Sequence, residues 1–216
     1  MKEIIITYFL NYILIIFLGF FYTFFDIGDL DSFVNGPSIY IVNIFLIITT
    51  LYLYLKSRRY EKKMQLKDIL PLIALGVSIA LFLNMLILLF SNNYSSDIFP
   101  FYLMLISSGI VGPIYEEILF RYIFYNRLTK KFSFLYAILI NSFIFALVHF
   151  SFIKSIYAFV LGIIFCLVYH KKKNILAPIL VHMAANTIVL FINGFSIPIL
   201  FLSIINSFIF FYIVLS

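Results

Sequence analysis

Three short groups of ionisable and amide side chains lie within stretches of this sequence that are otherwise apolar. In chain order the residues are Glu116, Glu117, Arg121, His149, His182 and Asn186. An ionised side chain is costly at membrane depth, so residues of this kind usually belong to a functional site. Carboxylates, imidazoles and an amide together are the groups that activate water and stabilise an oxyanion. The combination therefore predicts a site for hydrolysis.

The acidic pair is expected to divide its roles. Adjacent residues point about 100° apart on a helix, so Glu116 and Glu117 cannot do the same work. Glu117 and Arg121 are four residues apart with the acid first, which favours an ion pair on one helix face. Glu116 would then face a cavity as a general base. The alternative is a structural buried ion pair beside a spare, protonated Glu116.

The two imidazole groups fit the same chemistry. His149 follows Phe145 by four residues, so both lie on one helical face, and the imidazole can hydrogen-bond the water that Glu116 would deprotonate. His182 and Asn186 are also four residues apart and present two donors for an oxyanion. The alternatives are a core histidine satisfied by a backbone carbonyl, and polar residues that hydrogen-bond neighbouring membrane helices.

The composition predicts an all-α membrane protein with many spans. Of its 216 residues, 64% are hydrophobic and 11% are charged. Soluble domains are about 45–50% apolar and about 25% charged. No stretch leaves room for a soluble domain of ordinary size. The single cysteine, Cys166, permits no internal disulfide.

Eight apolar stretches are predicted as membrane helices, which need about 20 residues each. They cover residues 4–25, 38–55, 69–90, 99–126, 133–150, 153–169, 175–192 and 196–215. Pro113 predicts a break or kink in the fourth, which would place the acidic pair just after the bend. We expect one membrane domain over 1–216, with no recognised motif in 1–98, a catalytic core at 99–192 and a final span at 193–216.

The basic residues predict the orientation, because cytoplasmic loops are enriched in Lys and Arg. With eight spans, one side receives every Lys and Arg except Arg121 and Lys154. The other side receives Asp26, Asp29, Asp31 and Asp97. Both termini are therefore expected in the cytoplasm, with the chain in the cell membrane. The net charge of +6 indicates contact with anionic lipid headgroups, not with nucleic acid.

The three polar groups are expected to meet at one depth. At 1.5 Å per residue, the distances from the basic side are roughly 18 Å for Glu116, 22 Å for His149 and 10–12 Å for His182. Helix tilt and a kink or shifted helix start can remove the mismatch. The groups can therefore converge in the middle or inner half of the bilayer.

The ordered motifs Glu116-Glu117-x-x-x-Arg121, Phe145-x-x-x-His149 and His182-x-x-x-Asn186 resemble those of the CPBP family. This family comprises the CAAX-prenyl-protease and bacteriocin-processing membrane proteins, also called Abi. The resemblance covers about residues 99–192 and implies an intramembrane peptidase with an internal polar cavity. By this likeness Glu116 activates water, His149 positions it, His182 and Asn186 stabilise the oxyanion, and Glu117 and Arg121 support the site. Tyr122 stands where the family often has Gly, a departure that would narrow the cavity.

A metal cofactor is left as an alternative. The family is commonly labelled metalloprotease, and two His with a Glu could hold a catalytic zinc ion with an open position. However, the sequence lacks a His-Glu-x-x-His spacing, and the two histidines lie on different predicted helices. The metal-free arrangement is therefore favoured.

The leading interpretation is an endopeptidase that cleaves a peptide or membrane protein near the cytoplasmic leaflet by direct attack of water. No Ser or Cys shares a motif with the histidines, which disfavours a covalent nucleophile. The family suggests a bacteriocin or pheromone leader, a small membrane protein or a prenylated C-terminus as substrate. One alternative is a non-catalytic bacteriocin-immunity or regulatory protein of the same fold. Another is a transporter or proton channel, although no paired repeat with broken helices is evident.

Overall fold

The computed structural model describes residues 2–25, 27, 37–57, 59–90, 100–149, 152–192 and 194–216. All regular structure in these ranges is helical, so the predicted all-α fold is confirmed. The four aspartates expected on the side opposite the basic loops lie outside the described residues.

Eight helices are described, one in each of the eight predicted apolar stretches, and five of them are long and apolar enough to span a membrane. They are α1 (Lys2–Phe24), α3 (Pro37–Lys56), α4 (Leu66–Phe90), a composite helix, α8 (Phe134–Leu147), α9 (Phe152–Lys172), α10 (Leu176–Val189) and α11 (Ile197–Leu215). The composite helix, called the motif helix below, consists of α5 (Phe101–Met104), η1 (Leu105–Val111), α6 (Gly112–Glu117), η2 (Ile118–Tyr125) and α7 (Asn126–Leu128).

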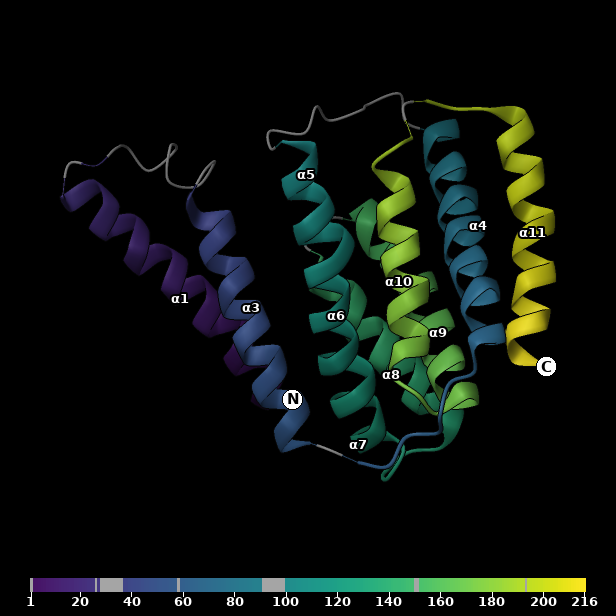
Figure 1. Cartoon of the computed structure of the whole chain (residues 1–216), viewed down its shortest axis with the longest axis horizontal. Helices are drawn as coiled ribbons and strands as arrows, with labels where there is room; N and C mark the ends of the chain where they lie inside the picture. The colour runs from purple at the N-terminus through teal and green to yellow at the C-terminus, as the bar shows by residue number, and fades with distance from the viewer. Residues whose placement is uncertain are drawn as a thin grey trace.

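The helices form a bundle with the site helices at its centre (Figure 1). α10 packs between α4 and the motif helix, α8 pairs with α9, α11 covers α4, and α1 packs on α3 at the opposite edge. Successive helices alternate in direction, so the loops after α3, α7 and α9 meet at the lower end of Figure 1. We call this the basic end because these loops carry most of the lysines and arginines. That it faces the cytoplasm stays a prediction.

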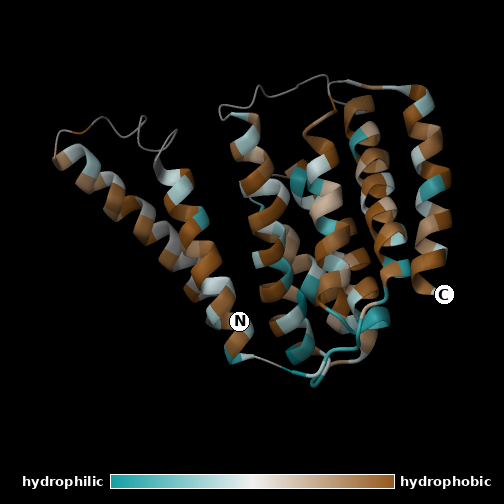
Figure 2. Cartoon of the chain, in the orientation of Figure 1, coloured by the Kyte–Doolittle hydropathy of each residue, from teal (hydrophilic) through white to brown (hydrophobic). Residues whose placement is uncertain are grey.

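The helix lengths fit a protein that crosses the bilayer several times. α3, α4, the motif helix, α9 and α11 are each long and apolar enough to span a membrane. Figure 2 shows hydrophobic residues along these helices and hydrophilic ones in the loops of the basic end. α8 and α10 have 14 residues each, or about 21 Å at 1.5 Å per residue, less than the ~30 Å hydrocarbon core. Neither helix is therefore long enough to cross the hydrocarbon core by itself.

We predicted a break or a kink near Pro113; the motif helix continues through this residue, so it does not break there. A π-helical segment, η1, precedes the proline. At its end Gly112 N–H donates to Ser107 O, five residues back. The carbonyl of Ser108 thereby loses its usual partner, and Pro113, five residues further on, has no N–H to offer. The helix accommodates the proline by this π-helical segment and leaves one backbone acceptor available.

A close contact between α4 and α10 fixes the height of α10 in the bundle. A Cβ added to Gly76 would lie 2.2 Å from the carbonyl oxygen of Val181. Only glycine permits this approach of the two backbones, as is common between membrane helices. Val181 immediately precedes His182, so the contact helps to position the imidazole.

Candidate active site

A buried ion pair supports the site. Arg121 Nη1 lies 3.1 Å from Glu117 Oε1, and both side chains are 0% exposed, as the spacing predicted. The guanidinium carbon lies 4.2 Å from the ring centre of Phe145 and 5.1 Å from that of Phe165. Its Nη2 donates to the carbonyl of Gly162 at 3.4 Å. Aromatic faces attract a desolvated cation, so the charge is stabilised on several sides.

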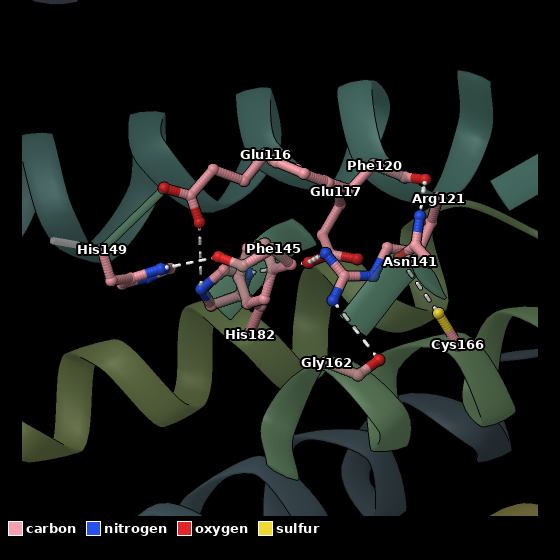
Figure 3. Close-up of polar contacts among 10 residues, drawn as sticks. All are labelled: Glu116, Glu117, Phe120, Arg121, Asn141, Phe145, His149, Gly162, Cys166 and His182. Carbon is pink, nitrogen blue, oxygen red and sulfur yellow. Dashed lines mark hydrogen bonds and ion pairs between the residues drawn. The ribbon is translucent and has the colours of Figure 1, made fainter. Parts of the chain in front are cut away.

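His182 lies between the two carboxylates (Figure 3). Its Nδ1 donates to Glu117 Oε1 at 2.9 Å, since an ionised carboxylate can only accept. Its Nε2 faces Glu116 Oε2 at 3.7 Å. The imidazole also stacks on the Phe165 ring, with 4.5 Å between ring centres and 25° between planes. These contacts fix the orientation of the ring and place a proton on Nδ1.

Glu116 is the more accessible of the two glutamates. Its side chain is 23% exposed, whereas that of Glu117 is fully buried. Glu117 is compensated by a guanidinium, while the ionic contact described for Glu116 is with the imidazole of His182. The adjacent carboxylates thus have different surroundings, which is the arrangement that suits one structural and one reactive group.

His149 lies in the turn after α8, not inside a helical span over 133–150 as predicted. Its backbone N–H donates to Ala146 O at 3.1 Å, and its ring atom Nδ1 lies 2.9 Å from the carbonyl oxygen of Phe145. The last carbonyls of a helix lack partners within it, and the imidazole provides one. Because a carbonyl only accepts, Nδ1 carries a proton, and Nε2 is the ring nitrogen left for another partner. Figure 3 shows the ring on the side to which the Glu116 carboxylate points.

Asn186 makes a contact that the sequence did not reveal. Its Nδ2 donates to the carbonyl of Ser108 at 2.8 Å, the acceptor that the π-helical segment before Pro113 leaves available. The amide therefore joins α10 to the motif helix, in line with the alternative of an interhelical bond. One N–H of the amide is left for another acceptor.

Three further side chains support the site and were not predicted to belong to it. Asn141 Nδ2 donates to the Phe120 carbonyl at 2.8 Å, within the second π-helical segment, and Cys166 Sγ donates to Asn141 Oδ1 at 3.2 Å. The third is Phe165, which lies against both His182 and Arg121. A polar residue within an apolar span was a usable signal for Asn141. One phenylalanine among 28 gave no comparable signal.

The donor atoms do not form a metal centre as they stand. A catalytic zinc ion takes three protein ligands at about 2.0–2.2 Å. Nδ1 of His182 is hydrogen-bonded to Glu117, and Nδ1 of His149 is hydrogen-bonded to a backbone carbonyl. Each ring therefore has only Nε2 left to bind a metal ion. Within the described ranges no group of three or more His, Cys, Asp or Glu side chains is placed to hold an ion.

Comparisons with known proteins match the part of the chain that carries the site. Residues 98–188 match the family model described as "Type II CAAX prenyl endopeptidase Rce1-like". The chain is 42% identical over 87 residues to the "Putative membrane peptidase YdiL" of Bacillus subtilis (strain 168). It is 33% identical over 93 residues to the "Membrane-embedded CAAX protease MroQ" of Staphylococcus aureus (strain USA300).

These similarities cover limited parts of both partners. Each alignment includes 40% of this chain, and it covers 36% of the Bacillus protein and 37% of the Staphylococcus protein. A protein of Lactococcus lactis subsp. lactis (strain IL1403), "UPF0177 protein YxdF", is 40% identical over 80 residues, which is 36% of this chain and 43% of that protein. No solved structure is significantly similar to the chain.

Proposed function

We infer that this chain is an intramembrane endopeptidase with Glu116 as its general base. Its residues 98–188 belong to the CPBP family of CAAX-type membrane proteases. The observation that carries the proposal is the contrast between adjacent glutamates. Glu117 is engaged in an ion pair with Arg121 and a hydrogen bond with His182. Glu116 is partly exposed and faces Nε2 of His182. A water held between Glu116 and His182 would be oriented for attack on a peptide carbonyl.

The charges of the cluster support this assignment. If His182 carries a proton on each ring nitrogen, Nδ1–H serves Glu117 and Nε2–H faces Glu116. Glu116 would take a proton from water as the hydroxide attacks, and the carbonyl oxygen would gain the negative charge. Nε2–H of His182 would then stabilise that oxyanion. Negative charge would move between neighbouring groups without a change in the total.

The remaining motif residues would position the water, the oxyanion and His182. In a neutral His149, Nδ1 serves the Phe145 carbonyl and Nε2 would accept a hydrogen bond from the attacking water. Asn186 would add its second N–H to the oxyanion while its first holds α10 to Ser108. Glu117 would hold the His182 ring in position through a hydrogen bond, and Arg121 would hold Glu117 through the ion pair.

We propose a peptide segment within or beside the membrane as the substrate class, with hydrolysis independent of a metal. The test uses purified protein in lipid nanodiscs with a library of membrane peptides, and mass spectrometry of new termini. Cleavage by the wild type but not by Glu116→Gln, unchanged by a chelator, is expected. Cleavage lost with the chelator and restored by zinc would overturn the metal-free mechanism. Absence of Glu116-dependent cleavage across the library, with a folded protein, would favour the non-catalytic binding role.

A further inference from the structure

A second site lies at the basic end, apart from the glutamates and histidines. It is a cavity of about 250 Å³ between the end of α3, the loop that follows it and the end of the motif helix. Four of its lining residues are cations, namely Lys56, Arg59, Arg127 and Lys130, and none of the residues that line it is acidic. We propose that this cavity binds the headgroup phosphate of an anionic phospholipid.

Two of the cations are oriented by aromatic rings. The Arg59 guanidinium carbon lies 4.5 Å from the ring centre of Tyr122, and the Arg59 backbone N–H donates to the Tyr122 hydroxyl at 2.9 Å. Lys56 Nζ lies 5.3 Å from the ring centre of Tyr52 and donates to its hydroxyl at 3.2 Å. A ring orients a cation without cancelling its charge. The cavity is therefore both ordered and positive.

Two carboxylates near this end, Glu61 and Asp68, do not line the cavity. Glu61, whose charge acts on Arg59, accepts the backbone N–H of Ile175 at 3.1 Å with Oε1. Asp68 pairs with Lys172 at 3.2 Å. Because none of the residues that line the cavity is acidic, an added anion would complement its charge.

A lipid fits the surroundings better than a free phosphate ion does. Leu51, Tyr52 and Leu55, in the last turns of α3 before Lys56, are 55–57% exposed and provide an apolar surface for acyl chains. The buried Ile123 also lines the cavity. Pockets that enclose a whole small molecule are about 300–1,000 Å³, so the smaller volume here suits a headgroup whose chains stay in the bilayer.

A headgroup here would brace the end of the motif helix. Asn126, another lining residue, donates to the carbonyls of Arg121 and Tyr122 at 3.1 and 3.0 Å and to the Tyr169 hydroxyl at 2.7 Å. Binding would therefore connect α3, the loop and the helix that carries the acidic pair. The site is independent of the proposed peptidase activity and stands if that activity fails.

The test measures binding of short-chain phosphatidylglycerol to the detergent-purified full chain by calorimetry. Phosphatidylcholine and inorganic phosphate serve as comparison ligands. The cavity variant is Lys56→Gln/Lys130→Gln, in which both altered side chains are exposed. The matched control is Lys63→Gln/Lys171→Gln, which removes the same charge from exposed positions at the same end but outside this cavity.

The cavity variant is expected to bind phosphatidylglycerol at least about tenfold more weakly, at about fivefold per basic residue, while the control stays within about twofold. Arg59→Lys, which keeps the charge but loses the planar group that stacks, should weaken binding by a smaller factor. Equal losses in the two double variants would overturn the proposal in favour of general surface charge. Equally tight binding of inorganic phosphate would overturn the choice of a lipid.

Discussion

At the scale of the residue, the partner of each charged group decides what it can do. The Glu117–Arg121 pair was predictable because four residues make about one helical turn. The bond from His182 to Glu117 was not, because it joins residues 65 positions apart and no local pattern encodes it. The position of His149 was missed for a related reason. Hydrophobicity continues past Leu147, whereas the helix ends there and the imidazole caps it.

Removal of the Arg121 side chain is expected to destabilise the fold severely. Arg121→Ala leaves the carboxylate of Glu117 buried without its cation, a change that costs about 3–5 kcal/mol. The unfolding temperature and the monodisperse yield in detergent should both fall. Lys131→Ala, which removes a cation from an exposed position outside the cavity, is the control and should retain most of the wild-type values. An Arg121→Ala protein as stable as the wild type would show that the pair contributes little.

At the scale of the element, apolar length predicted the helices, but not how they join at the site. Pro113 signalled a lost hydrogen bond, and a break was the simplest expectation. The chain instead forms a π-helical segment, and the bond is replaced by Asn186 from a helix far along the sequence. Such a replacement depends on which helices become neighbours, which a local pattern does not contain.

The link between Pro113 and Asn186 should appear as energetic coupling. Asn186→Ala removes the donor to Ser108 and should cost about 1 kcal/mol. Pro113→Ala restores an N–H to the motif helix and gives Ser108 a donor of its own, so Asn186→Ala should cost less in that background. A double-mutant cycle of unfolding free energies measures the difference. Costs that simply add would mean that the two residues act independently.

The contact of Gly76 with α10 should tolerate no side chain. Gly76→Ala places a Cβ against the Val181 carbonyl and should destabilise by about 1–3 kcal/mol, since overpacking forces backbones apart. It should also lower cleavage, because His182 would move away from the glutamates. Gly194→Ala is the control, since nothing lies within 4 Å of a Cβ built there. Equal stability of the two variants, measured by thermal unfolding, would argue against the contact.

At the scale of the whole molecule, the order of the motifs indicated a family resemblance before the fold was known. The match over residues 98–188 confirms that resemblance. Helices α1, α3 and α4 precede the matched residues, and hydrophobicity alone predicted them. The loop after α3 connects this part to the site helices: Lys62 N–H donates to Lys173 O at 3.0 Å, and Asn174 Nδ2 to Lys62 O at 2.8 Å.

Glu61 in this loop should make the stability of the molecule depend on pH. Burial raises the pKa of its carboxyl above the ordinary value of 4.5. A raised folded-state pKa contributes stability that is complete below about 4.5 and is lost as the pH rises through the higher folded value. The wild type should therefore gain more unfolding temperature than Glu61→Gln on acidification from pH 7 to about pH 5. Parallel curves for the two proteins would contradict this.

The most direct test of the central claim is the initial rate of peptide cleavage by wild type, Glu116→Gln and Glu61→Gln in the same nanodiscs. Glu61→Gln is the matched control, because it makes the same substitution in the loop after α3. General base catalysis is worth about 10²–10⁴ in rate. We predict that Glu116→Gln is at least about 100-fold slower with an unchanged unfolding temperature, while Glu61→Gln stays within about twofold at pH 7. A folded Glu116→Gln protein that cleaves at the wild-type rate would contradict the account.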